Sequence, residues 1–369
     1  MHLENIPALR IGELEINPPI IQGGMGVRVS RANLASAVAN TGCAGVIASA
    51  GLGLFENFPG REFEKLNRQA FREEIRKARS QSDGVIGVNI MVALSDNDGL
   101  IQAAVEENVD LIISGAGLPL SLPQYVGRKN IKLLPVVSSA KALRIICRRW
   151  NKSFNRLPDA VIVESAQAGG HLGYPYDDVV NNTTPSLEQT VREVIKVANS
   201  FVPKIPVLAA GGVFDGKDIA DYLKMGASGV QMATRFVCTD ECDAHENFKK
   251  AYLDATADDI TIIQSPVGLP GRVIKNSFVE RIKQGGTVPV RCEYKCLKTC
   301  EPGKAPYCIA KVLADAASGK LEESFVFAGS NAYRCNEIVS VKTLVGQLVE
   351  ELRTALSDEA GLQEQVADK

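Results

Sequence analysis

Residues 207–234, VLAAGGVFDGKDIADYLKMGASGVQMAT, contain the pattern that decides the fold. An apolar run at 207–210 leads into two glycines, and a second apolar run follows at 229–232. Between them apolar residues recur at helical spacing. Asp215 stands where it can cap this helix, and Gly226 stands where the helix can end. A strand, a helix and a second strand joined by short turns predict one β/α unit of a parallel sheet.

The same unit recurs along the chain from about residue 18. Its strands are continuous apolar runs, as expected for parallel strands covered by helices. We place them at 20–22, 45–48, 85–90, 111–114, 133–137, 160–164, 207–210 and 229–232. Such a series predicts an α/β fold, a (β/α)8 TIM barrel. An open, doubly wound sheet is the alternative, because hydrophobic periodicity does not report whether a sheet closes.

The sequence changes character after the eighth helix, which is expected at 245–255. We therefore assign residues 1–255 to the barrel and residues 256–369 to an appendage packed on it. The appendage begins with a polar turn and continues with a cysteine-rich stretch at 291–308. Two further helices are expected at 309–317 and 341–356.

Composition narrows the class of protein. Apolar residues make up 45% and charged residues 23%, the ordinary range for a globular protein with a full core. A net charge of −2 gives no basic field for a nucleic-acid backbone. The chain contains no apolar run of about 18 residues and no apolar core of a signal peptide near residue 1, so we expect no membrane association and a cytoplasmic location.

A phosphate site is predicted where the run at 207–210 ends. In a barrel, the turns after the seventh and eighth strands often bind phosphate. Gly211 and Gly212 allow backbone amides to approach an anion closely, and the N-terminus of the following helix adds partial positive charge. Thr234, after the eighth strand, adds a hydroxyl donor. A tight turn without a ligand is the alternative explanation for the glycine pair.

Polar and glycine-rich residues at three other strand ends predict a site for a flat heterocycle. The turn IQGGMGV has neither a Walker lysine nor Rossmann spacing, but its backbone is suited to lie against a ring, with the Met25 amide facing it. A turn with Met25 as core filler is the alternative. Asn89 and Glu164 each end an apolar run, where a polar side chain requires a partner.

His171 is the candidate catalytic residue. It follows two glycines in SAQAGGHLGY, the loop after the sixth predicted strand, and only three histidines occur in the chain. Imidazole is suited to proton transfer because its unperturbed pKa lies near neutrality. A buried structural histidine is the alternative.

Together these motifs resemble one family. QGGMG, Asn89, ESAQAGGH, LAAGGV, GVQMATRF and GRVIKN occur in the order found in nitronate monooxygenases, formerly 2-nitropropane dioxygenases, and in the related enoyl-ACP reductase II. The resemblance spans about residues 18 to 280. It implies an FMN cofactor held by Gly24, Met25, Gly26, Asn89, Glu164, Gly169, Gly170, Ala210, Gly211, Gly212, Gln231, Met232, Ala233 and Thr234.

The same resemblance makes His171 the active-site histidine and implies that the segment around Gly271, Arg272 and Asn276 borders the substrate entrance. Two departures are Gly26, where related reductases often carry alanine, and Gln167, where a glutamate is commoner. Without that glutamate, the basicity of His171 is left open.

The first functional hypothesis is an FMN-dependent nitronate monooxygenase that converts alkyl nitronates and dioxygen to carbonyl compounds and nitrite. The second is an NAD(P)H-dependent reductase of enoyl thioesters. The third is an electron-transfer protein that carries flavin or metal. Small-molecule substrates, NAD(P)H or an acyl thioester are the candidate ligands, and a homodimer is the candidate assembly.

The cysteine-rich stretch is the feature that the resemblance explains least. Cys292, Cys296, Cys300 and Cys308 are candidate ligands for zinc or an iron–sulfur cluster, with Cys335 as an additional ligand. Their spacing matches neither the common zinc ribbon nor the usual ferredoxin run. Reduced cysteines in a lid over the barrel are the alternative.

Overall fold

The computed structural model describes residues 6–54, 62–127, 130–290, 292 and 294–367, and for 358–367 the backbone alone. A sheet of eight parallel strands forms its centre, in the order β3-β11-β10-β8-β7-β6-β5-β4. A parallel bridge between Ile21 and Ala44 joins β3 to the start of β4, so the sheet closes into the predicted barrel. The strands are β3 (Ile20–Gln22), β4 (Gly45–Ala48), β5 (Ile86–Asn89), β6 (Leu111–Ser114), β7 (Lys132–Val137), β8 (Val161–Glu164), β10 (Val207–Ala210) and β11 (Gly229–Met232).

These bounds agree closely with the sequence. Five of the predicted runs coincide with observed strands, and the other three differ by one residue at one or both ends. The agreement follows from burial, because strands covered on both faces are continuous apolar segments that stop where polar turns begin.

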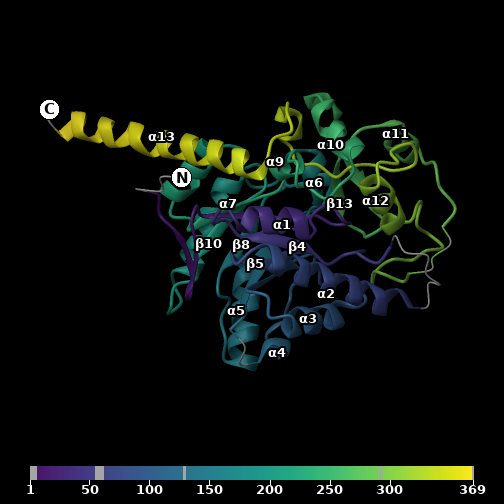
Figure 1. Cartoon of the computed structure of the whole chain (residues 1–369), viewed down its shortest axis with the longest axis horizontal. Helices are drawn as coiled ribbons and strands as arrows, with labels where there is room; N and C mark the ends of the chain where they lie inside the picture. The colour runs from purple at the N-terminus through teal and green to yellow at the C-terminus, as the bar shows by residue number, and fades with distance from the viewer. Residues whose placement is uncertain (1–5, 55–61, 128–129, 291, 293, 368–369) are drawn as a thin grey trace.

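Helices follow each strand and surround the barrel (Figure 1). The unit that decides the fold behaves as predicted: α8 is capped by Asp215 and is followed by Gly226 at φ +100°. The covering helices are α1 (Ala32–Ala39), α2 (Phe63–Gln81), α3 (Asn97–Glu106), α4 (Pro123–Val126), α5 (Ala140–Phe154), α7 (Leu187–Ala198), α8 (Gly216–Lys224) and α10 (Glu246–Leu253). Short helices α6 (Tyr176–Val180) and α9 (Thr234–Val237) supplement them after β8 and β11.

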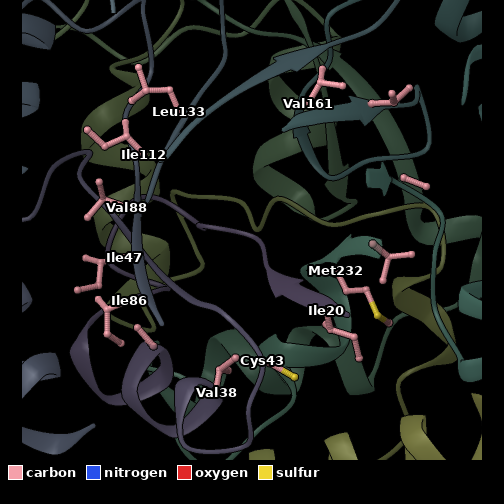
Figure 2. Packing of buried hydrophobic residues seen from close by; sticks show 14 of the residues in the cluster. Ile20, Val38, Cys43, Ile47, Ile86, Val88, Ile112, Leu133, Val161 and Met232 are labelled. Carbon is pink, nitrogen blue, oxygen red and sulfur yellow. The ribbon is translucent and has the colours of Figure 1, made fainter. Parts of the chain in front are cut away.

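Side chains alternate between the two faces of each strand and thus divide the apolar core into an outer and an inner cluster. Ile47 points outward and packs with residues of the helices and of neighbouring strands, such as Val88 and Ile112 (Figure 2). Its neighbour Val46 belongs instead to the cluster inside the barrel. A hairpin of β1 (Leu9–Ile11) and β2 (Leu14–Ile16) joins this inner cluster, so its apolar side chains fill the interior away from the mouth.

The chain after α10 is packed on the barrel mouth. Strands β12 (Ile260–Gln264) and β13 (Pro270–Ile274) are antiparallel, and β13 also pairs with β9 (Gly170–His171) from the loop after β8. Thus the later segment holds a barrel loop in place. The remaining elements are α11 (Ser277–Lys283), α12 (Ile309–Ala317), α13 (Val341–Ala367) and the 3-10 turns η2 (Ala257–Asp259) and η3 (Ala332–Arg334).

Helix α12 has the predicted bounds, whereas α13 is longer than predicted. It packs against α8 and buries Leu344, Leu348 and Leu352, and its far end extends beyond the barrel (Figure 1). No helix in the described ranges has the length and apolar character required to cross a membrane.

Candidate active site

A cavity lies at the carboxyl ends of the barrel strands, which we call the mouth cavity. Every residue predicted to bind the flavin lines it, from Gly24 after β3 to Thr234 after β11, and so does His171. The lining includes residues from each of the eight barrel strands or the turns that follow them, as barrel closure requires. The structure brings the predicted residues together, while their role in holding a cofactor stays a prediction.

Glycine is required at the turn after β10. Gly211 and Gly212 have φ values of +84° and +89°, where side chains are strained. A Cβ on Gly211 would lie 2.9 Å from Ser165 Oγ and 3.0 Å from the Ala168 nitrogen. On Gly212 it would lie 2.1 Å from Gln167 Oε1. The turns after β8 and β10 thus pack closely here, and neither glycine position has room for a side chain.

The N-terminus of α8 does not support an anion at this turn, contrary to expectation. The Asp215 carboxylate accepts from the Asp218 amide at 3.0 Å, and Asp218 accepts from the Phe214 amide at 2.8 Å. The Gly216 amide donates to Glu351 Oε2 of α13 at 2.8 Å. Because carboxylates already occupy these amides, a phosphate would gain from the Gly211–Gly212 and Ala233–Thr234 backbone instead.

The turn after β3 also differs in detail from the prediction. The Met25 amide donates to Ser30 Oγ at 3.0 Å, and the Ser30 amide donates back to the Met25 carbonyl at 2.9 Å. Gln22 Nε2 donates to the same hydroxyl at 2.8 Å. The Met25 amide is therefore used within its own loop and does not face the cavity as a free donor. The Gly24 backbone lies against Asn89, whose Cβ would be 2.5 Å from an added Cβ.

Two buried polar side chains of the mouth cavity have unusual surroundings. Gln231 Oε1 has no hydrogen-bond partner among the described residues, although it is shielded from solvent. Burial raises the pKa of Glu164 to about 7, so this carboxyl is largely protonated below neutral pH. An unpartnered buried oxygen such as Gln231 Oε1 is typical of a ligand site, and a strongly raised carboxyl pKa such as that of Glu164 is typical of a functional site.

His171 lies in β9 and is held by the segment after the barrel. Its Nε2 lies 2.7 Å from Ser265 Oγ, just beyond β12, and the ring of Phe327 meets it edge to face at 4.9 Å. Burial lowers the pKa of His171 to about 4, so the imidazole is neutral at physiological pH. Sequence reasoning missed Ser265 and Phe327, because neither belongs to a recognisable motif.

The three residues that mark the expected entrance segment lie behind the site. Arg272 donates to the carbonyls of Ala166 and Ala168 at 2.6 and 3.3 Å and thereby fixes the loop that carries His171. Gly271 pairs with His171 across the sheet, and Asn276 caps α11. None of Gly271, Arg272 and Asn276 lines the mouth cavity or the cavity beside it. These three residues support the site from behind, whereas Val267 and Leu269 of the same segment line the adjoining cavity. That this segment borders the substrate entrance stays a prediction.

A second cavity adjoins the first, and we call it the apolar cavity. It shares His171, Met91 and Leu313 with the mouth cavity, so the imidazole stands at the junction. Its lining is almost entirely hydrocarbon, and part of it comes from Cys296 and Leu297 of the cysteine-rich stretch.

The predicted metal site finds no support. Within the described ranges, no group of three or more His, Cys, Asp and Glu side chains is arranged to hold a metal ion. Cys296 faces the apolar cavity, and burial, followed by the nearby Cys308, Cys292 and Cys300 thiols, raises its pKa to about 12.

Cys335 lies apart from that stretch. It is buried beside Cys238, in a cluster with Cys242. The remaining cysteines, Cys43 and Cys147, are fully buried core residues, as expected.

Comparison with known proteins assigns the family. The family model described as nitronate monooxygenase matches residues 8–351. A probable nitronate monooxygenase of Staphylococcus haemolyticus is 26% identical, with 93% of this chain and 96% of that protein covered. The structure of FabK from Thermotoga maritima superposes with a TM-score of 0.73 at 28% identity, covering 93% of this chain and 95% of that one.

A Mycobacterium tuberculosis protein named (3aS,4S,5R,7aS)-5-hydroxy-7a-methyl-1-oxo-octahydro-1H-indene-4-carboxyl-CoA dehydrogenase is 30% identical over 73% of this chain. The match spans 66% of the mycobacterial protein's length. The family match covers the barrel, the loop that carries His171 and the segment that supports it. The chain therefore belongs to the nitronate monooxygenase family of oxidoreductases.

Proposed function

We propose that this protein is an FMN-dependent nitronate monooxygenase that converts alkyl nitronates and dioxygen to carbonyl compounds and nitrite. The observation that carries the proposal is the position of His171, a neutral imidazole at the junction of the mouth cavity and the apolar cavity. A substrate in the apolar cavity would present its reacting end to both the imidazole and a ring in the mouth cavity.

The mouth cavity fits a flavin in three respects. The Gly211–Gly212 backbone has no side chain to obstruct a phosphate. The unpartnered Gln231 Oε1 is an acceptor for a ring or ribityl donor. The protonated Glu164 and the Asn89 amide are donors for ring oxygens and nitrogens. When bound, the flavin would supply the electron acceptor that the reaction requires.

The role of His171 follows from its hydrogen bond and its low pKa. In the tautomer where Ser265 donates to Nε2, the ring proton lies on Nδ1 and is available to a nitronate oxygen. A histidine with a pKa of about 4 is a weak base, so it serves better as a neutral hydrogen-bond donor than as a proton acceptor. This suits a nitronate, which has already lost its carbon-bound proton.

Oxygen uptake tests the proposal. The overall reaction balances when two nitronates and one dioxygen give two carbonyl compounds and two nitrites. We expect the purified protein to carry flavin and to consume oxygen with nitronate, without added nicotinamide, while releasing nitrite. A colourless protein that does not bind added FMN would contradict the cofactor, and flavoprotein without nitronate-dependent uptake would contradict the reaction.

One observation favours a second candidate, an NAD(P)H-dependent reductase of enoyl thioesters. The apolar cavity beside the imidazole suits an acyl chain as well as an alkyl nitronate, and the similarity to FabK is compatible with it. NAD(P)H oxidation that requires an enoyl thioester would establish this activity. The electron-transfer hypothesis stays a prediction, and its metal-carrying form has no support because no metal-ligand group is found among the described side chains. A homodimeric assembly and a cytoplasmic location stay predictions.

A further inference from the structure

The cysteine-rich stretch is attached to the barrel at one defined place. Leu297 forms an antiparallel bridge with Leu94, in the loop after β5. The Ser95 amide donates to the Cys296 carbonyl at 3.0 Å, and the Lys298 amide donates to the Ala93 carbonyl at 2.9 Å. These backbone bonds fix the stretch beside the strand that ends in Asn89, at the edge of the mouth cavity.

This attachment places side chains of the stretch on one wall of the apolar cavity. Cys296 and Leu297 line it, and α12, which begins directly after Cys308, adds Ile309 and Leu313. The opposite boundary is the barrel mouth itself, with His171 at the junction.

Several polar residues of the wall have hydrogen-bond partners within the protein. The Asn67 side chain donates to the Ser49 carbonyl and accepts from the Gly53 amide, both at 3.2 Å. Ser95 Oγ donates to the Lys295 carbonyl at 2.6 Å. Asp96 Oδ1 accepts from Arg68 at 2.9 Å, whereas Asp96 Oδ2 is shielded from solvent and has no partner among the described residues. The surface that remains accessible to a ligand is nevertheless almost entirely hydrocarbon. Such a wall contributes to binding in proportion to the apolar area that a ligand buries.

We propose that the cysteine-rich stretch is the outer wall of a binding site for an extended alkyl chain, so that the preferred substrates carry a neutral unbranched chain of several carbons. Leu297 and Cys296 contact the chain, and the reacting end lies toward His171. Resting on the proposed function, this inference names its substrate class: longer-chain nitronates rather than the smallest ones. It also assigns Cys296 a packing role in this wall.

Unreactive n-alkanols test the site independently of turnover. We would titrate 1-butanol, 1-hexanol and 1-octanol into the purified flavin-containing protein by calorimetry. Each methylene buried in hydrocarbon is worth about a fourfold gain in affinity, so octanol should bind roughly two orders of magnitude more tightly than butanol. Affinity that does not change with chain length would overturn the proposal.

Variants locate the binding to the wall. Leu297→Asn should remove most of the gain from butanol to octanol, whereas Leu118→Asn, an equivalent change at an exposed leucine that lines neither cavity, should preserve it. Ala93→Phe adds volume at the wall and should reduce octanol affinity more than butanol affinity. Flavin content and melting temperature report whether each variant is folded. Unchanged octanol binding in both wall variants would refute the assignment.

Turnover then separates this proposal from the proposed function. The value of kcat/KM for the nitronate of 1-nitrooctane should exceed that for 1-nitrobutane, and the excess should shrink in Leu297→Asn. If octanol binds as expected but no nitronate is turned over, the alkyl site stands and the monooxygenase proposal fails. If nitronates are turned over with no dependence on chain length, the monooxygenase proposal stands and the alkyl-site proposal fails.

Discussion

The two adjoining cavities are built in different ways. The mouth cavity is rich in glycine backbone, and Gly24, Gly211 and Gly212 leave no room for a Cβ. The apolar cavity is lined by ordinary side chains such as Leu94, Leu297 and Ile309. A backbone-built site is marked in the sequence, because glycine is the only residue that fits. A side-chain-built site has no such mark, since the same residues occur in any core.

The largest expected effect concerns the backbone-built site. Gly211→Ala should abolish stable flavin binding, because its Cβ would collide with Ser165 and Ala168 and displace the turn. Gly285→Ala is the matched control: its φ is +86°, close to the +84° of Gly211, but an added Cβ meets nothing within 4 Å. Both changes incur the same backbone strain, about 1 kcal/mol. Flavin absorbance of the purified variants is the measurement.

Equal flavin content in Gly211→Ala and Gly285→Ala would show that close packing at Gly211 is not required for cofactor binding.

The second effect concerns His171, at the junction of the mouth cavity and the apolar cavity. His171→Ala should lower turnover by roughly 10²- to 10⁴-fold, the usual range for a residue that assists proton transfer or hydrogen bonding in the transition state. Flavin content should not change, because the ring is proposed to contact substrate. Steady-state kinetics with the active nitronate or thioester measure the loss. Turnover within twofold of the unaltered protein would show that the imidazole is structural.

The third effect concerns how the free energy of unfolding of flavin-free protein depends on pH, to which His171 and Glu164 should contribute in opposite directions. The His171 pKa lies at about 4 when folded and near 6.5 when unfolded, so its contribution to stability is full above 6.5 and is lost as the pH falls toward 4. The Glu164 pKa is raised to about 7, so its contribution is full below about 4.5 and is lost as the pH rises through 7.

Single variants should reveal the contribution of each residue to the slope of the free energy of unfolding against pH. Each variant is compared with the unaltered protein between pH 4.5 and 6.5. Relative to that protein, the free energy of unfolding of His171→Gln should fall with rising pH, and that of Glu164→Gln should rise. Each difference should change by up to about 3 kcal/mol over this range. Urea titrations across this range are the measurement. Parallel curves for the two variants would contradict burial as the cause of both shifts.

The difference between the cavities also explains which predictions succeeded. Buried strands and the glycine turns were predicted because both leave local patterns, and the residues from Gly24 to Thr234 do meet at one cavity. The capping of α8 was predicted too, but its consequence was missed: Asp215 and a phosphate compete for the same amides. The cysteine spacing suggested a metal, whereas the thiol of Cys296 faces an apolar wall, and that depends on long-range packing.

The smallest effect concerns Ser265, which orients His171 from the segment after the barrel. Ser265→Ala removes the hydroxyl 2.7 Å from Nε2 and should lower kcat about tenfold, the equivalent of one hydrogen bond, with little change in KM. Loss of a donor to Nε2 destabilises the neutral ring, so the acid limb of the kcat profile should move to higher pH.

Ser324→Ala controls for burial, because that serine is equally buried but donates to the Lys320 carbonyl and lines neither cavity. A positioning role requires that Ser265→Thr restore the rate and that Ser324→Ala leave the acid limb in place. If both alanine variants shift the pH profile equally, the shift reflects destabilisation of the segment after the barrel. The position of His171 would then depend on the pairing of β9 with β13 and not on Ser265.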